Sequence, residues 1–506
     1  MKRLIYMIFS VLPFVATSQN MYNITGLLEN DPTGTARFIS MGGSMGALGG
    51  DLSVMGTNPG GMAVYRSSEF NLTGVYDVVK NNAKLGKTSV LSDYNGVNLS
   101  NMGFVIACDV DEHPVKYVNF GGNFRRKANL SRNFEMYGAA NESFSQQNVF
   151  DYLYRQNSFE PGSMTSDMYG NFQYDWLTML AVGAEITDED GNFLYNPDGT
   201  FIYNPTSLGY YSEERGALNV FDMNISVNVN DIVYIGATVG CHFLDYSRYS
   251  FYYENDSEGG IYSLTNDYRI SATGYDFKIG AIFRPLANLM PLKFGLFVHT
   301  PVFYKLLDCS SAEMTGPYGK VASTQSSDCY GDNLYSTYNL KTPWRLGAAV
   351  SYTFGKSLAL NAEYEYANAA STSFTDRGGI YDVQNEENSY NLKKQHTVRV
   401  GAEYMWGKLA FRAGYNYISS PFSTDAYKCI DNTTISETST EYMNRFSKNI
   451  FTLGAGYTGK SWYLDLAYMC QLQKADFYPY DGGYPIPATT VNTTGHSIIA
   501  GVGICF

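Results

Sequence analysis

The chain has 506 residues, of which only 16% are charged, and its formal net charge is −13. A negative chain is a poor partner for nucleic acid, which attracts basic surfaces, so we expect none. The mean hydropathy is −0.22, and no apolar run beyond the N-terminus is long enough to predict a membrane-spanning helix. Abundant Tyr, Phe and Gly with few charges is typical instead of a membrane β-barrel.

The N-terminus predicts export. Lys2 and Arg3 precede an apolar stretch over 4–15, and Ala16-Thr17-Ser18 follows with small residues at the cleavage positions. This pattern indicates a signal peptide over 1–18, and a buried N-terminal helix is the alternative.

Residues 19–63 are rich in glycine and too irregular for a strand. Their apolar side chains argue against a disordered leader, which is the other interpretation. We therefore predict a plug that folds back into the lumen of the barrel.

From residue 64 to 506, apolar side chains recur at every second position, as in strands with one face toward lipid. In the last segment, Ile498, Val502 and Ile504 share one face with Phe506, and glycines share the other. The pattern predicts an all-β, antiparallel transmembrane barrel of about fourteen strands. The expected strands are 64–80, 94–110, 114–130, 216–230, 231–253, 262–285, 290–305, 336–354, 357–371, 391–406, 407–420, 444–459, 460–475 and 493–506.

Short turns alternate with long polar connections along this series, as periplasmic turns alternate with extracellular loops in bacterial outer-membrane barrels. The longest loop, 131–215, contains two apolar segments of helical character near 149–153 and 176–182. These helices are expected either to cap the barrel around an apolar vestibule or to form a self-packed surface loop.

Six charged side chains are predicted to face the lumen from neighbouring strands. We expect them to form ion pairs that fix the shape of the lumen, and a carboxylate-binding role is the alternative. They are Arg345, Glu363, Glu365, Arg399, Glu403 and Arg412.

The sequence predicts no metal site, no cofactor and no catalytic residues. Seven cysteines occur without metal-binding spacing, and Cys309 and Cys329 either pair across a loop or stay unpaired. Gly42-Gly43-Ser44-Met45-Gly46 matches the G-x-S-x-G pattern of hydrolases but lacks a flanking strand and helix. We therefore do not expect an enzyme.

Several motifs together resemble the FadL/TodX family of outer-membrane transporters for hydrophobic compounds. The motifs are Ala36-Arg37, Met41-Gly42-Gly43, 47–51, Asn58-Pro59-Gly60, 300–302, 342–347, 399–404 and 412–415. The resemblance implies that Asn58, Pro59 and Gly60 form the plug motif, with Gly60 where the family has alanine. It also implies a kink in the third strand, for which Gly121 and Gly122 are the candidates.

The resemblance implies passive uptake of fatty-acid-like or aromatic molecules through extracellular capture, plug movement and lateral exit into outer-membrane lipid. The expected partners are a hydrophobic small molecule, outer-membrane lipid and the barrel assembly machinery, which would read the C-terminal Phe506. The main alternative is a barrel that acts as surface anchor or carrier subunit for secreted proteins. A water-filled porin is disfavoured by the plug.

Overall fold

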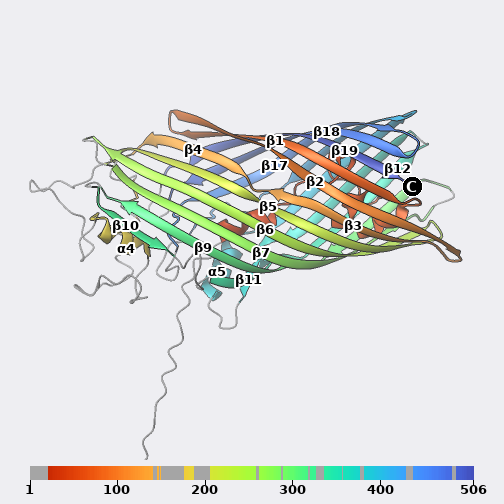
Figure 1. Ribbon diagram of the computed structural model, residues 1–506, viewed down its shortest axis with the longest axis horizontal. Helices are drawn as coiled ribbons and strands as arrows, with labels where there is room; N and C mark the ends of the chain where they lie inside the picture. The colour runs from red at the N-terminus through yellow and green to blue at the C-terminus, as the bar shows by residue number, and fades with distance from the viewer. Residues whose placement is uncertain are drawn as a thin grey trace, which may run out of the picture.

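The chain forms one closed, antiparallel β-barrel of fourteen strands in a computed structural model (Figure 1). The barrel closes where β1 (Glu69–Leu85) pairs with β19 (Thr489–Cys505). The structure describes residues 21–140, 145–146, 149, 176–186, 205–257, 261–286, 289–316, 319–325, 336–355, 357–375, 381–428, 437–480 and 486–506. The predicted signal peptide therefore lies outside the described residues.

Four of the fourteen strands are interrupted, so the fourteen consist of nineteen segments. The interrupted strands are the third (β3, Val115–Asn129, and β4, Arg132–Ala139), the seventh (β8, Leu292–His299, and β9, Phe303–Thr315), the eighth (β10, Val321–Gln325; β11, Ser336–Lys341; β12, Arg345–Phe354) and the ninth (β13, Leu358–Asn368, and β14, Ser373–Thr375). The other strands are continuous: β2 (Thr88–Glu112), β5 (Pro205–Val229), β6 (Val233–Asp256), β7 (Ile261–Phe283), β15 (Lys394–Trp406), β16 (Leu409–Ile418), β17 (Tyr442–Thr458) and β18 (Trp462–Tyr478).

The predicted fold and strand register are confirmed by the side-chain exposure along the strands. Ile498 and Ile504 of β19 are 52% exposed, whereas the neighbouring Ile499 is fully buried. The same alternation places leucine, valine and aromatic side chains on the outside of the other strands. A closed barrel with this outer surface is a transmembrane barrel of the outer-membrane type, because only closure pairs every strand edge in lipid. Among the described residues, no helix is long and apolar enough to cross a membrane.

The strict alternation of short and long connections was wrong at the end of the barrel that carries α4 (Trp176–Gly183), here called the α4 end (Figure 1). β1 and β2 continue to a two-residue turn at Gly86-Lys87, where Gly86 has a φ of 59°. β6 and β7 also extend further than predicted, β4 continues the third strand, and β5 begins at Pro205. Beyond the membrane a strand needs no apolar outer face, so the alternation that marks a strand in the sequence disappears there.

Residues 21–68, here called the lumen segment, precede β1 and lie inside the barrel. They form short helices: α1 (Met21–Ile24), η1 (Thr25–Leu28), α2 (Ala36–Ser40), η2 (Leu52–Gly56) and η3 (Pro59–Val64). Thr35 caps α2 and Asp51 caps η2 through their side-chain oxygens, and the two side chains also bond each other at 2.7 Å. The methionines Met41, Met45, Met55 and Met62 are fully buried in a core of their own.

The α4 end of the lumen is filled by an apolar core. Leu177 and Leu180 of α4 pack there with inward side chains of the strands, including Phe134, Tyr210 and Met314. α4 itself lies within one of the two helical segments predicted from the sequence, and the other lies almost entirely outside the described residues. Two further helices of the described residues, η4 (Ala369–Ser371) and α5 (Asp382–Asn391), follow β13 and β14.

Candidate functional site

The turn at Asn58 fixes the lumen segment to the wall. The Asn58 side chain accepts a hydrogen bond from the Gly60 amide at 3.1 Å and donates to the carbonyls of Gly46 at 2.5 Å and Ala281 at 3.2 Å. Wall glycines leave the room for this turn: a Cβ on Gly236 or Gly280 would overlap Pro59 or Asn58. A Cβ on Gly60 would likewise press on the Gly280 carbonyl, so glycine rather than alanine suits this position.

Arg37 makes a bidentate ion pair between the lumen segment and the wall. Its guanidinium binds both carboxylate oxygens of Glu403 at 2.9 Å and donates to the Gly50 carbonyl at 2.7 Å. Glu403 also accepts from Arg412 at 2.6 Å, and Arg412 reaches Asp465 at 2.6 Å. The bidentate pair between Arg37 and Glu403 is the strong form of an arginine–carboxylate interaction.

A second buried network joins the other four predicted lumen charges. Arg399 lies 2.6 Å from Glu363 and 2.9 Å from Glu365, and Arg345 lies 3.5 Å from Glu365. Glu363 also accepts from the Gly46 amide at 2.8 Å. All six predicted side chains therefore come together in ion pairs. All three carboxylates also hold the lumen segment, because Glu365 accepts a hydrogen bond from the Asn30 side chain at 2.9 Å.

Replacing Arg399 with methionine is expected to destabilise the barrel by about 3–5 kcal/mol, because the buried Glu363 loses its ion-pair partner and Glu365 keeps only the ion pair with Arg345 at 3.5 Å. Urea unfolding in detergent micelles, followed by tryptophan fluorescence, measures the change. The matched control is Arg66→Met, which removes an ion pair with Asp231 whose arginine side chain is 58% exposed, and should cost at most about 1 kcal/mol. Equal losses in the two variants would contradict a structural role for the Arg399 network.

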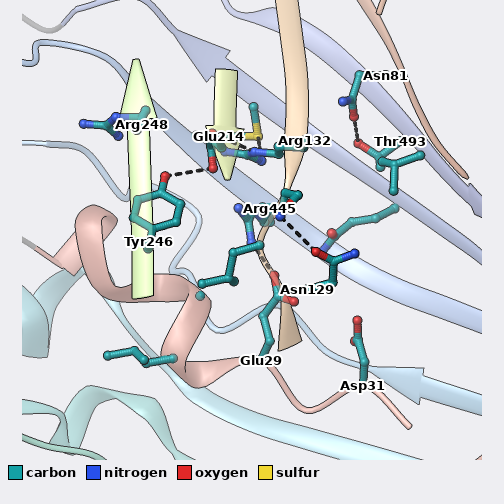
Figure 2. A pocket seen from close by; sticks show the side chains of 18 of the residues that line it. Glu29, Asp31, Asn81, Asn129, Arg132, Glu214, Tyr246, Arg248, Arg445 and Thr493 are labelled. Atoms are coloured by element: carbon teal, nitrogen blue, oxygen red, sulfur yellow. Dashed lines mark hydrogen bonds and ion pairs between the residues drawn. The ribbon is translucent and has the colours of Figure 1, made fainter. Parts of the chain in front are cut away.

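A cavity of about 160 Å³, here called the central cavity, lies between the lumen segment and the barrel wall. Figure 2 shows side chains that line it. The lumen segment contributes Leu27, Glu29 and Asp31 to its lining. The strands contribute apolar side chains such as Leu244 and Ile270, together with the charged groups Arg132, Glu214, Arg248, Arg445 and Lys448. An apolar vestibule was one of the two alternatives that the sequence left open for the long loop, whereas the lining of this cavity mixes apolar and charged side chains.

The charges that line the central cavity are paired across it. Arg445 bonds Glu29 at 2.5 Å, and Lys448 holds both oxygens of Asp31 at 2.8 and 2.9 Å. Burial raises the pKa of Asp31 in spite of Lys448. Burial acts the same way on Glu29, but Lys448 and Arg445 outweigh it and hold the pKa of that carboxyl below its usual range. Two carboxylates of the lumen segment, Glu29 and Asp31, therefore form ion pairs with basic groups of the wall.

Beside this cavity the backbone hydrogen bonds between the second and third strands end, although the two strands still lie side by side. β3 pairs with β2 from Val115 to Arg125, and in the described strands the residues beyond Arg125, with all of β4, pair only with β5. Residues 88–100 of β2 pair only with β1. Side chains bridge the two free edges: Arg126 bonds Asn98, and the Asn133 side chain donates to the Asp93 carbonyl at 2.9 Å.

The central cavity reaches this gap, because Asn129, Leu130, Ser131 and Arg132 line it. These four residues join β3 to β4 at the point where the third strand is interrupted. An internal cavity and a seam in the barrel wall therefore share the same short segment.

The glycines predicted to kink the third strand lie short of the gap. Gly121 and Gly122 pair in register with both β2 and β5, and the register shifts between Arg126 and Ala128. A Cβ on Gly121 would overlap Met55 of the lumen segment. Gly121 therefore makes room for the lumen segment, and the interruption comes a few residues later.

The Ser44 hydroxyl is buried against the wall and accepts a hydrogen bond from the Asn361 amide at 2.6 Å. Its surroundings are those of a packing contact between the lumen segment and the strands. Among the described residues, no group of His, Cys, Asp and Glu side chains is arranged to hold a metal ion. Cys329 lies outside the described residues, so its pairing with Cys309 stays a prediction.

No protein-family model matches the chain, and no curated protein sequence matches it. Solved barrels do match. A Pseudomonas aeruginosa FadL homologue aligns over 94% of this chain and 98% of its own length, with 13% identity and a TM-score of 0.55. The chain has the FadL/TodX fold. The P. putida toluene transporter TodX (12% identity, TM-score 0.55) and the Ralstonia pickettii toluene transporter TbuX (14%, 0.51) each align over 94% of this chain and 99% of their own. The FadL/TodX fold thus accounts for nearly the whole chain.

Proposed function

We propose that the barrel takes up small hydrophobic molecules with a polar end, holds them in the central cavity and releases them sideways through the seam between β2 and the end of β3. The observation that carries this proposal is the shared segment: residues 129–132 both line the cavity and border the gap in the wall. The likeness to the FadL homologue and the toluene transporters TodX and TbuX supports the substrate class.

A sideways route suits an apolar solute. Each Å² of apolar surface that leaves a nonpolar environment for water costs about 25 cal/mol, so direct passage into the membrane avoids an unfavourable step. The wall on either side of the gap is bridged by side chains rather than by a backbone ladder. Side-chain bridges can part without breaking the strand pairing elsewhere in the barrel.

The polar end of the substrate would use the basic groups of the cavity. Arg445 and Lys448 hold the carboxylates of Glu29 and Asp31, and a ligand carboxylate would compete for the same donors. Such competition would loosen the first part of the lumen segment, from residue 21 to 33. The turn at Asn58 and the Arg37–Glu403 pair hold the remainder of the segment independently of the cavity. In the predicted plug, residues 21–33 would therefore move, and the remainder of the lumen segment would stay bound to the wall.

The test is mass spectrometry of small molecules extracted from the folded, purified barrel. Ala475 is buried and lines the central cavity, so Ala475→Trp should fill it. Ala413 lies on the outer, lipid-facing surface of β16, so Ala413→Trp is the matched control. We expect fatty acids or other apolar compounds to be enriched with the unmodified protein and with Ala413→Trp, and lost with Ala475→Trp.

Equal recovery from all three proteins would mean that the molecules come from the detergent or the outer surface. Recovery of nothing from the unmodified protein would contradict an importer and favour a role as anchor or carrier for secreted proteins.

A further inference from the structure

A second and smaller cavity lies between the lumen segment and the wall, with a volume of about 40 Å³. It shares Leu27 and Asp31 with the central cavity and is here called the cationic cavity. Its wall side carries five basic side chains: Arg125, Lys127, Lys278, Arg345 and Arg399. Among the described residues that line it, the acidic side chains are Asp31 and Asp276.

Four of the five basic side chains already have acidic partners. Arg125 and Lys278 share Asp222 at 3.1 and 3.0 Å. Arg345 and Arg399 are held in the network with Glu363 and Glu365 described above. Lys127 is different: among the described residues it forms no hydrogen bond and no ion pair.

The two acids in the lining are not available to Lys127. Lys448 holds both oxygens of Asp31. Asp276 is bound by Lys278 at 2.6 Å and lies 3.3 Å from His242. The cavity and its paired neighbours therefore carry one positive charge in excess, at Lys127.

The lumen segment contributes to the lining two threonines whose hydroxyl groups lack partners. Thr33 and Thr57 line the cavity, and neither hydroxyl oxygen has a hydrogen-bond partner among the described residues. A buried hydroxyl normally has a partner, and the half-buried Lys127 lines the cavity without a counterion. A negatively charged acceptor placed in the cavity would satisfy all three groups.

We propose that the cationic cavity binds a small inorganic anion of the halide class, chloride in the cell, between Lys127 and the hydroxyls of Thr33 and Thr57. The size of the cavity decides the class. One water molecule needs roughly 10–15 Å³ of cavity volume. A cavity of about 40 Å³ therefore holds one hydrated ion and no alkyl chain. The bound anion joins β3 to the lumen segment and thereby stabilises the closed lumen.

The first test is a crystal of the unmodified barrel grown or soaked in sodium bromide. The expected result is an anomalous bromide peak within hydrogen-bond distance of the Lys127 Nζ atom. A cavity that contains only water, with bromide elsewhere or absent, would overturn the proposal.

The second test works in solution and compares sodium chloride with sodium gluconate at equal ionic strength, because gluconate is too large for the cavity. Chloride should raise the thermal unfolding midpoint of the unmodified protein in a saturable way, and Lys127→Met should lose that response. The matched control is Lys293→Met, which removes another lumenal lysine whose Nζ donates to the Leu48 carbonyl at 3.0 Å and which does not line the cavity.

A chloride response that survives in Lys127→Met, or that disappears equally in Lys293→Met, would contradict the assignment. If Lys127→Met does not fold, Lys127→Arg keeps the charge and should keep the response. The bromide crystal decides the question without any variant.

Discussion

Replacing Gly280 with valine is expected to make the barrel conduct ions. Gly280 faces the lumen from β7, where a Cβ would overlap the Asn58 side chain and Pro59. The turn cannot simply shift away, because Asn58 also bonds Gly46 within the lumen segment and Ala281 on the wall. To relieve the overlap, the lumen segment must therefore move away from the wall at Gly280.

The expected size follows from the cost of overpacking a close contact, about 1–3 kcal/mol. A free-energy difference of that size changes the ratio of barrels with a displaced lumen segment to barrels with a bound lumen segment roughly 5–150-fold. Single-channel recording in planar bilayers measures the change as more frequent or longer openings.

The matched control is Gly74→Val on β1, where a new Cβ meets nothing closer than the Asn98 carbonyl at 3.9 Å. This variant adds the same volume to a strand without touching the lumen segment, so its conductance should match that of the unmodified protein. A folded Gly280→Val barrel that stays closed would show that the lumen segment is not the barrier to ions.

The strands were predictable because the membrane imposes a local rule. Leu464, Leu466 and Tyr468 lie on the outside of β18, and Asp465 lies inside, as alternation requires. Strand residues beyond the lipid no longer need to alternate between apolar and polar side chains. The polar residues of β1 and β2 near Gly86 carry no alternation, so the sequence suggested a loop where the structure has a hairpin.

The candidate site was only partly predictable, because its pairs join distant parts of the chain. Inward-facing charges such as Arg399 and Glu403 stood out from their strand alternation, and Asp465 and Lys278 could have been found by the same signal. Glu29 and Asp31 could not, because the irregular lumen segment has no register that points them toward Arg445 and Lys448. The wall glycines also gave no signal, since nothing local shows that Gly236 and Gly280 make room for another backbone.

Linking the two free edges of the wall is expected to abolish transport. Asn98 of β2 and Arg126 of β3 are bonded across the gap just beyond the last paired residues, Asn101 and Arg125. In the double variant Asn98→Cys/Arg126→Cys, a flexible bismaleimide should join the two strands and hold the seam shut. Uptake of a radiolabelled fatty acid by cells that express the linked barrel should fall to background. The single variants Asn98→Cys and Arg126→Cys, treated in the same way, should keep their uptake.

The control for the chemistry lies on the same two strands. Ile106 and Phe120 face each other where β2 and β3 are fully paired, and both point outward. Linking Ile106→Cys to Phe120→Cys therefore ties strands that the backbone ladder already holds, and uptake should persist. If the gap link also leaves uptake intact, the substrate must pass along the lumen, and the lumen segment rather than the wall is the exit. Loss of uptake in the gap-linked barrel alone would place the exit between β2 and the end of β3, where side chains rather than a backbone ladder join the two strands.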